Sequence, residues 1–163
     1  MGYWALIAAS DETVQDLELA ATRRLDEAWI LHGADSYHSA IYLAGFSAEM
    51  YLKTTCFFLG GAKPGDPVAG LRDQLRPGKY KPPYTAHYES GHGLEFWLEE
   101  LLLRRQRLGL PSPPRLFEEV VRELCEDWCV EMRYRPGLAT AWDAGRFIIQ
   151  VEWLARHHAA LRR

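Results

Sequence analysis

The sequence has few cysteines and lacks the short motifs that mark common catalytic and metal sites. Three cysteines in 163 residues, with no basic signal-peptide start in Met1 to Ser10, favour a cytoplasmic protein with reduced thiols. No glycine-rich phosphate loop, HExxH, paired-cysteine motif or nucleophile elbow occurs, so no cofactor and no metal is indicated. Cys125 and Cys129 are four residues apart on a predicted helix, but further ligands at a workable spacing are missing, which favours packing in the core.

The sequence also lacks an uncharged apolar run long enough to span a membrane. The longest apolar stretch, residues 40–59, carries Glu49 and Lys53 near its middle. A charged pair at that place favours a buried helix of a water-soluble protein over a membrane span, so we expect no membrane partner. No alternation typical of β-strands competes with the helical patterns.

Charge is not of one sign but is unevenly distributed along the chain. The net charge is −3, yet residues 1–60 carry eight acids and three bases, and residues 130–163 carry six arginines and three acids. The segment 60–89 carries five bases and three acids. This pattern is compatible with ordinary surface charge, or with a phosphate-bearing partner held on a basic side.

Apolar residues recur at steps of three and four along most of the chain, which predicts an all-α fold of about five helices in a single domain, 1–163. Capping residues, glycines and prolines set the expected limits. The predicted helices run from Ser10 or Asp11 to about Leu31, from Asp35 to Leu59, from Ser90 or Gly91 to about Leu108, from the prolines at 111–114 to Trp128, and from Thr140 to about Leu161.

The second predicted helix is apolar on nearly all sides, which places it in the middle of a bundle or between subunits. A long Pro/Gly-rich loop follows at 60–89, in which Val68 to Leu75 is predicted to form a helical turn or two. Aromatic and basic residues alternate in this loop and either bind nucleic acid or anchor the loop to the surface. These residues are Lys79, Tyr80, Lys81, Tyr84, His87 and Tyr88.

Three segments together resemble the HEPN family (higher eukaryotes and prokaryotes nucleotide-binding), over residues 20–158. In the first, an apolar-glycine-aromatic stretch precedes Glu49 and, four residues later, Lys53. The second is similar to the His-x-Leu opening of the next long helix of that family, and the third to its Trp…Arg-Tyr ending before the last helix. The segments are Ser39–Thr54 (SAIYLAGFSAEMYLKT), Gly91–Leu98 (GHGLEFWL) and Trp128–Tyr134 (WCVEMRY).

The resemblance implies an antiparallel up-and-down bundle, usually a homodimer, that acts in the cytoplasm on RNA or nucleotides. It also implies a possible separate nucleotidyltransferase partner, as in toxin–antitoxin pairs. Many members of the family are metal-independent ribonucleases with an arginine followed, after four to six residues, by a histidine near the start of the last helix. In this sequence neither Arg133, Arg135 nor Arg146 is followed by a histidine at that spacing, which argues against ribonuclease activity.

Glu49 and Lys53 stand in the favourable i, i+4 order on the apolar helix. Burial there requires that the two charges pair, so one interpretation is a structural ion pair. The other interpretation is that Lys53, with neighbouring arginines, holds a phosphate.

Arg133, Tyr134 and Arg135 come where a helix is predicted to end, so the cations either stabilise that end or grip phosphate bidentately, with Tyr134 stacking or donating a hydrogen bond. His92, at a predicted helix start, would tend to be neutral and is a weak catalytic candidate, together with Arg133. The same interpretation applies to His38. Simple hydrogen bonding within the bundle is the alternative for both histidines.

Three functions remain open on the sequence alone. The first is a non-catalytic, dimeric module that binds a nucleotide, RNA or a protein partner through a basic cleft. The second is a metal-independent ribonuclease with a rearranged site, in which Arg133 or Arg135 acts with His92 or His38. The third is a structural bundle that makes only protein contacts.

Overall fold

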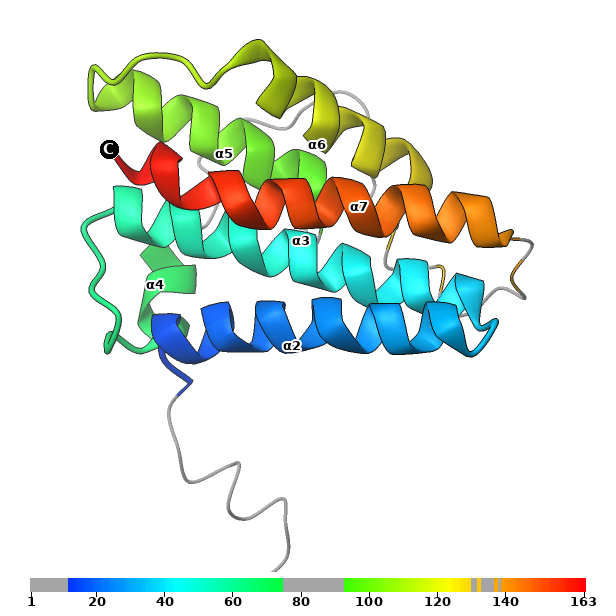
Figure 1. Cartoon of the computed structure of the whole chain (residues 1–163). Coiled ribbons are helices and arrows are strands. Elements are labelled where there is room, and N and C mark those ends of the chain that lie inside the picture. The colour runs from blue at the N-terminus through cyan, green and yellow to red at the C-terminus, as the bar shows by residue number, and fades with distance from the viewer. Residues whose placement is uncertain (1–11, 75–92, 130–131, 133–136, 138) are drawn as a thin grey trace, which may run out of the picture.

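In the computed structural model the chain forms an all-α bundle, as expected, and the structure describes residues 12–74, 93–129, 132, 137 and 139–163 (Figure 1). No β-strand occurs in these residues. The helices are α2 (Val14–Gly33), α3 (Tyr37–Leu59), the short α4 (Val68–Gln74), α5 (Leu94–Arg107), α6 (Arg115–Asp127) and α7 (Ala141–His157), and a 3₁₀ turn, η3 (His158–Arg162), follows α7.

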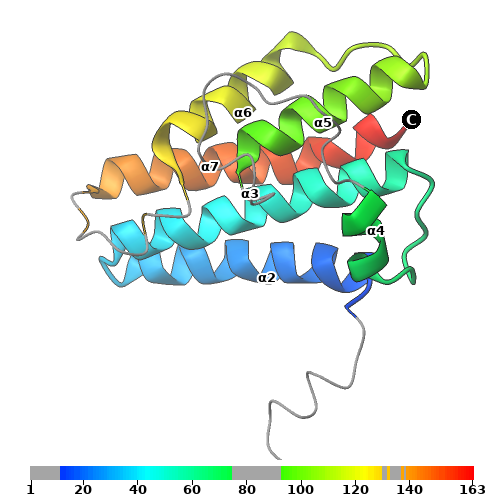
Figure 2. The same ribbon diagram turned by 180° about the vertical axis from the view of Figure 1, so that it is seen from behind.

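Helix α3 lies at the centre of the bundle, in contact with α2, α5, α7 and η3 (Figures 1 and 2). Most of its residues are buried, which confirms the position predicted from its apolar composition. Within the described ranges, no helix combines the length and the apolar character that a membrane crossing requires.

The directions of the helices explain why the connection between α3 and α5 is long. Helices α2 and α3 are antiparallel, as are α5 and α6, whereas α3 and α5 run in the same direction (Figures 1 and 2). Lys53 lies against Trp97, and the carbonyl of Cys56, almost one turn later, meets Arg104 further along α5. Two parallel neighbours require a connection that returns the chain to the starting end of the bundle.

The first helix begins later than its sequence predicts. Thr13 is the N-cap residue, and its hydroxyl accepts a hydrogen bond from the main-chain N–H of Asp16, whose carboxylate accepts one from the N–H of Thr13. The predicted start at Ser10 or Asp11 is therefore wrong, because this reciprocal capping box satisfies the first turn. The start is also held by the main-chain N–H of Val14, which donates to Asp66.

The predicted helical turns inside the long loop are present as α4. Val68 is buried, and its N–H donates to the main-chain oxygen of Glu12, so that α4 is attached to the start of α2. The aromatic and basic part of the loop, from residue 79 onward, lies outside the described residues. The helix expected from Ser90 or Gly91 begins at Leu94.

The start of the last helix agrees with the sequence. Thr140 is the N-cap of α7, and Thr140 and Asp143 form the reciprocal capping box that their spacing predicts. Because the box is a purely local interaction, both of its members are visible in four residues of sequence.

Helix α6 ends at Asp127, and Trp128 continues in an extended conformation. Cys129 therefore lies outside the helix, and the prediction that Cys125 and Cys129 lie on one helix is wrong. The Trp128 indole N–H donates to the main-chain oxygen of Tyr42 at 3.1 Å, and the ring rests on Gly45. A Cβ atom at Gly45 would overlap this ring.

This contact gives a stability prediction. We expect Gly45→Ala to lower the free energy of unfolding by about 1–3 kcal/mol, because the added methyl group overpacks the contact with Trp128. Gly70→Ala is the control, since a Cβ at Gly70 in α4 meets no atom within 4 Å. Urea denaturation of the two variants measures both values, and equal stabilities would contradict the tight contact at Gly45.

Candidate functional site

The buried ion pair of α3 is the first of the sequence-predicted features. Glu49 and Lys53 are 1 % and 4 % exposed and are in contact with each other. The Lys53 ammonium also lies 5.3 Å from the ring centre of Trp97 in α5, a cation–π geometry. The Lys53 cation is therefore held inside the bundle by the Glu49 carboxylate and the face of the Trp97 ring. Both charges are removed from water, so each must be paired with the other.

The other predicted site residues, His92, Arg133, Tyr134 and Arg135, lie outside the described residues. Their position is constrained only through described neighbours in the sequence. Met132 directly precedes Arg133, and Gly137 is the second residue after Arg135.

Both of these neighbours contact His38 in the first turn of α3. The Nε2 atom of His38 is 2.8 Å from the main-chain oxygen of Met132, and a Cβ atom at Gly137 would overlap the His38 side chain. His38 thus lies against the described residues on either side of 133–136.

The hydrogen bond assigns a role to each ring nitrogen of His38. A carbonyl oxygen only accepts, so Nε2 must carry the proton and donate to Met132. In the neutral ring, Nδ1 is then the nitrogen with a free electron pair, which can accept a proton or a hydrogen bond. The sequence leaves the role of His38 open. In the structure its Nε2 is held by Met132, and Nδ1 is the nitrogen that can accept a proton.

The described contacts do not join Lys53 to the His38 end of the bundle. The two residues are fifteen positions apart on one helix, which is about 22 Å at the rise of an α-helix. The residues that flank 133–136 contact His38 rather than Lys53. The predicted site therefore separates into a buried ion pair in mid-helix and a histidine at the N-terminal end of α3.

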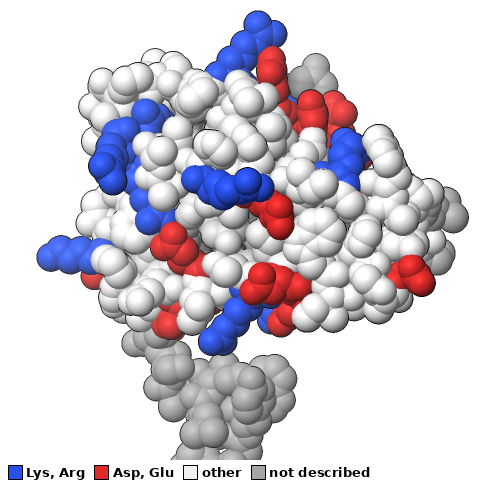
Figure 3. Space-filling view, in the orientation of Figure 1, with Lys and Arg blue, Asp and Glu red and all other residues white. Residues whose placement is uncertain are grey.

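The arginines of the C-terminal basic stretch that the structure describes are mostly engaged with acids. Cationic and anionic side chains are interspersed over the face shown in Figure 3. Such pairing leaves little excess positive charge on the described part of α7 and η3. The pairs are Arg146 with Asp127, Arg156 with Glu152, and Arg162 with Glu18.

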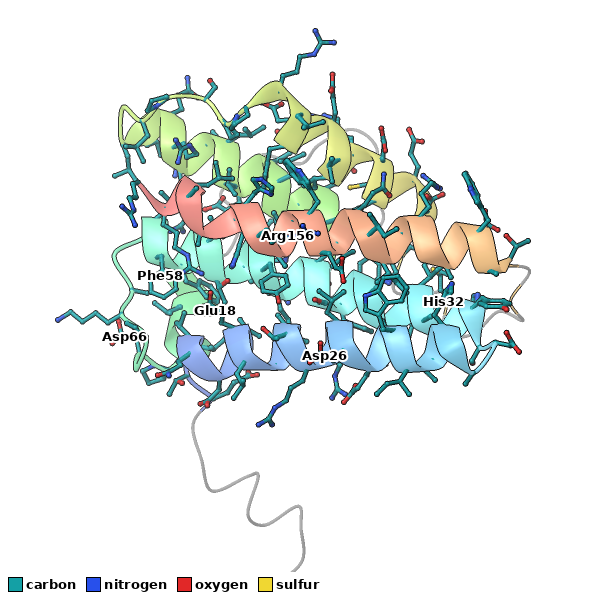
Figure 4. The ribbon with its side chains drawn as sticks, in the orientation of Figure 1. Glu18, Asp26, His32, Phe58, Asp66 and Arg156 are labelled. Atoms are coloured by element: carbon teal, nitrogen blue, oxygen red, sulfur yellow. The ribbon has the colours of Figure 1, made fainter. Side chains whose placement is uncertain are left out.

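Sequence reasoning missed a polar cluster where η3 meets α2 and α3. His158 is 3 % exposed, its ring centre is 4.6 Å from that of Tyr51, and its Nε2 is 3.5 Å from Glu18. Arg162 binds the same carboxylate at 2.6 Å and lies 4.2 Å from the ring centre of Phe58. Figure 4 shows Glu18 and Phe58 at this end of the bundle. No local signal could reveal the cluster, because His158 and Arg162 are a hundred or more residues away from the partners on α2 and α3.

Burial, and secondarily the charge of Arg162, lowers the pKa of His158 from 6.5 to about 4. The Nδ1 atom of this ring is buried without a hydrogen-bond partner among the described residues. A neutral ring packed in this way is a structural element that acid should disrupt.

We therefore expect acid to destabilise the fold through His158. The pKa of His158 in the folded protein lies below its value in the unfolded chain. The stability that the neutral ring contributes is therefore complete above about pH 6.5 and is lost as the pH falls toward 4. At pH 4.5 the loss in the free energy of unfolding should be about 2–3 kcal/mol. Urea unfolding between these limits should show a shallower pH dependence for His158→Gln than for the wild type. His157→Gln, which changes the exposed neighbouring histidine, should keep the wild-type slope; parallel curves for all three proteins would refute the role of His158.

Two of the three cysteines, Cys56 and Cys125, are shielded thiols. Burial raises the pKa of the Cys56 thiol, and it raises that of Cys125 to about 12. Both thiols are therefore protonated at neutral pH. The described part of the chain holds no group of three or more histidine, cysteine or acidic side chains arranged to bind a metal.

Comparison of the chain with family models, with curated proteins and with solved structures finds no match. Function must therefore be inferred from the residues and their arrangement.

Proposed function

We propose that this chain is a HEPN-like module that binds RNA, without cleaving it, at the end of the bundle where α3 begins. The proposed ligand-binding residues are Arg133, Tyr134 and Arg135, with His38 beside them. The observation that carries the proposal is the contact of His38 with both Met132 and Gly137, since these two residues flank the three proposed ligands in sequence.

The chemistry of this segment suits a single-stranded nucleic acid. Two guanidinium groups separated by one residue can bind successive phosphates, and Tyr134 between them supplies a ring on which a base can stack. The bond from His38 holds Met132, the residue before Arg133, against helix α3. Lys53 has a different part in this proposal: it supports the bundle through Glu49 and Trp97 rather than touching RNA.

The second candidate function is a metal-independent ribonuclease with His38 as the acid–base group. The observation that favours it is that His38, which is far from the arginine segment in the sequence, contacts both of its described flanks, Met132 and Gly137. The Nδ1 atom of His38 can take a proton from a ribose hydroxyl, while Arg133 or Arg135 stabilises the phosphate.

Binding of a generic single-stranded RNA tests the first proposal. We expect Arg133→Ala/Arg135→Ala to weaken binding about 10-fold or more at about 50 mM salt and less at 200 mM, because two phosphate contacts are lost. The slope of log affinity against log salt should fall by about 1.4. The binding is measured by fluorescence anisotropy at both salt concentrations.

The matched control is Arg115→Ala/Arg122→Ala, which removes the same charge from exposed arginines of α6. It should bind RNA nearly as the wild type does. Equal losses in the two double variants would mean general charge attraction and would refute the site. RNA cleavage by the wild type that disappears in His38→Gln would establish the ribonuclease instead.

We also propose that the protein is a homodimer, which the resemblance implies. Trp142 and Ile149 are 70 % and 54 % exposed and, seven residues apart on α7, share its outward face. Arg146 lies over the Trp142 ring at 5.3 Å, so this exposed surface is ordered by a cation–π contact and by an ion pair with Asp127. Exposed large apolar side chains on one face are typical of a subunit interface.

Sedimentation at tens of micromolar tests the dimer. We expect the wild type to sediment as a dimer and Trp142→Glu/Ile149→Glu as a folded monomer, because buried carboxylates would oppose association. Leu108→Glu/Leu116→Glu alters two equally exposed leucines beside the α5–α6 turn and should remain dimeric. A monomeric wild type would rule out the proposal.

A separate nucleotidyltransferase partner and a role in a toxin–antitoxin pair are further proposals, and both rest on the resemblance alone. A cytoplasmic location is part of the same proposal, since RNA is the proposed ligand.

A further inference from the structure

The five-residue turn η3 is attached to the bundle by side chains of other helices. Arg105 of α5 donates to the main-chain oxygens of Leu161 and Arg163, and the Thr55 hydroxyl of α3 donates to that of His158 at 3.5 Å. Figure 1 shows η3 at the end of the bundle where α2 begins, opposite to the start of α3. A short 3₁₀ turn has weaker internal hydrogen bonds than an α-helix, so its position depends on these attachments.

The turn η3 buries only a small apolar surface. Two of its side chains, His158 and Leu161, are 3 % and 5 % exposed. The His158 ring packs on Tyr51, and the Arg162 guanidinium lies over the ring of Phe58, both of α3. Detachment of η3 would uncover these contacts and leave the interfaces among the long helices unchanged. Such a terminal element can open locally without the unfolding of the whole domain.

One carboxylate serves both basic side chains of η3. Glu18 of α2 accepts a hydrogen bond from Arg162 at 2.6 Å and lies 3.5 Å from Nε2 of His158. Of the other described groups near the ring, Tyr51 is neutral and Arg105 is cationic. A proton on His158 would therefore place a further cation beside one shared anion. It would also put an N–H at Nδ1, a buried atom with no hydrogen-bond partner among the described residues.

We propose that η3 is a detachable turn that acid releases: protonation of His158 frees η3 while the helices α2 to α7 stay folded. The loss of stability in acid does not by itself distinguish this release from unfolding of the whole bundle. In the attached turn the pKa of His158 is about 4, and in the detached turn it returns to about 6.5. The equilibrium for detachment should therefore rise about 50- to 100-fold between pH 7.5 and pH 4.5.

Hydrogen exchange of main-chain amides, followed by NMR in low concentrations of urea at both pH values, separates local from global opening. We expect the protection of the amides of η3, corrected for the intrinsic exchange rate, to fall about 50- to 100-fold in acid. Their free energy of opening should hardly depend on urea, because detachment exposes little surface. The amide of Leu52, buried in the middle of the bundle, should show the larger urea dependence of global unfolding.

Three variants assign the release to His158 and to the shared carboxylate. In His158→Gln the protection of η3 should be nearly the same at both pH values, whereas His157→Gln, at the exposed neighbouring histidine, should behave as the wild type. Arg162→Gln should lower the protection of η3 at pH 7.5, because the turn loses its ion pair with Glu18. The same variant should show a smaller fall in acid, because Glu18 is then free to pair with the protonated ring.

Two results would overturn the proposal. The first is an equal urea dependence for the amides of η3 and for Leu52, which would mean that the turn leaves only when the whole bundle unfolds. The second is a loss of protection in acid that persists in His158→Gln, which would assign the release to another group. Neither result depends on RNA binding at the other end of the bundle.

Discussion

The Trp128 ring resting on Gly45 is the contact on which the arrangement of the candidate site depends. It fixes the end of α6 against the first half of the central helix, and the indole N–H donates to the main-chain oxygen of Tyr42 in α3. The chain that leaves Trp128 is then met by His38, which binds Met132. Gly45 in α3 and Trp128, the residue after α6, therefore determine which end of α3 lies beside Met132. Two of the three segments that resemble the HEPN family meet at this contact.

The buried pair of Glu49 and Lys53 plays a different part. An ion pair deep in a helical bundle contributes little net stability, because desolvation offsets much of the attraction, but removal of one partner is costly. Here the cation also faces Trp97, so α3 and α5 are fixed relative to each other by a contact with a specific geometry. The pair therefore helps to set the position of two parallel helices relative to each other.

Local features of the fold could be predicted from the sequence, and distant ones could not. The capping box of Thr140 and Asp143, the central position of α3 and the turns of α4 all follow from a few neighbouring residues. The start of α2 was misplaced because several good capping residues occur close together, and only the structure selects Thr13. The cluster around His158 depends on residues brought together by tertiary packing, for which one sequence carries no signal.

The distribution of charge shows most clearly that a single sequence does not reveal contacts between distant residues. The last 34 residues hold six arginines against three acids, and this excess suggests a basic face. In the described structure, however, Arg146 and Arg162 are paired with acids of α6 and α2, elements from the less basic part of the chain. The surplus of arginines counted along the sequence is thus offset in the folded protein by acidic residues of other helices. The described arginines of α7 and η3 that are paired in this way do not form the basic face that the sequence suggests, so the phosphate site proposed above is assigned to Arg133 and Arg135 and not to α7 as a whole.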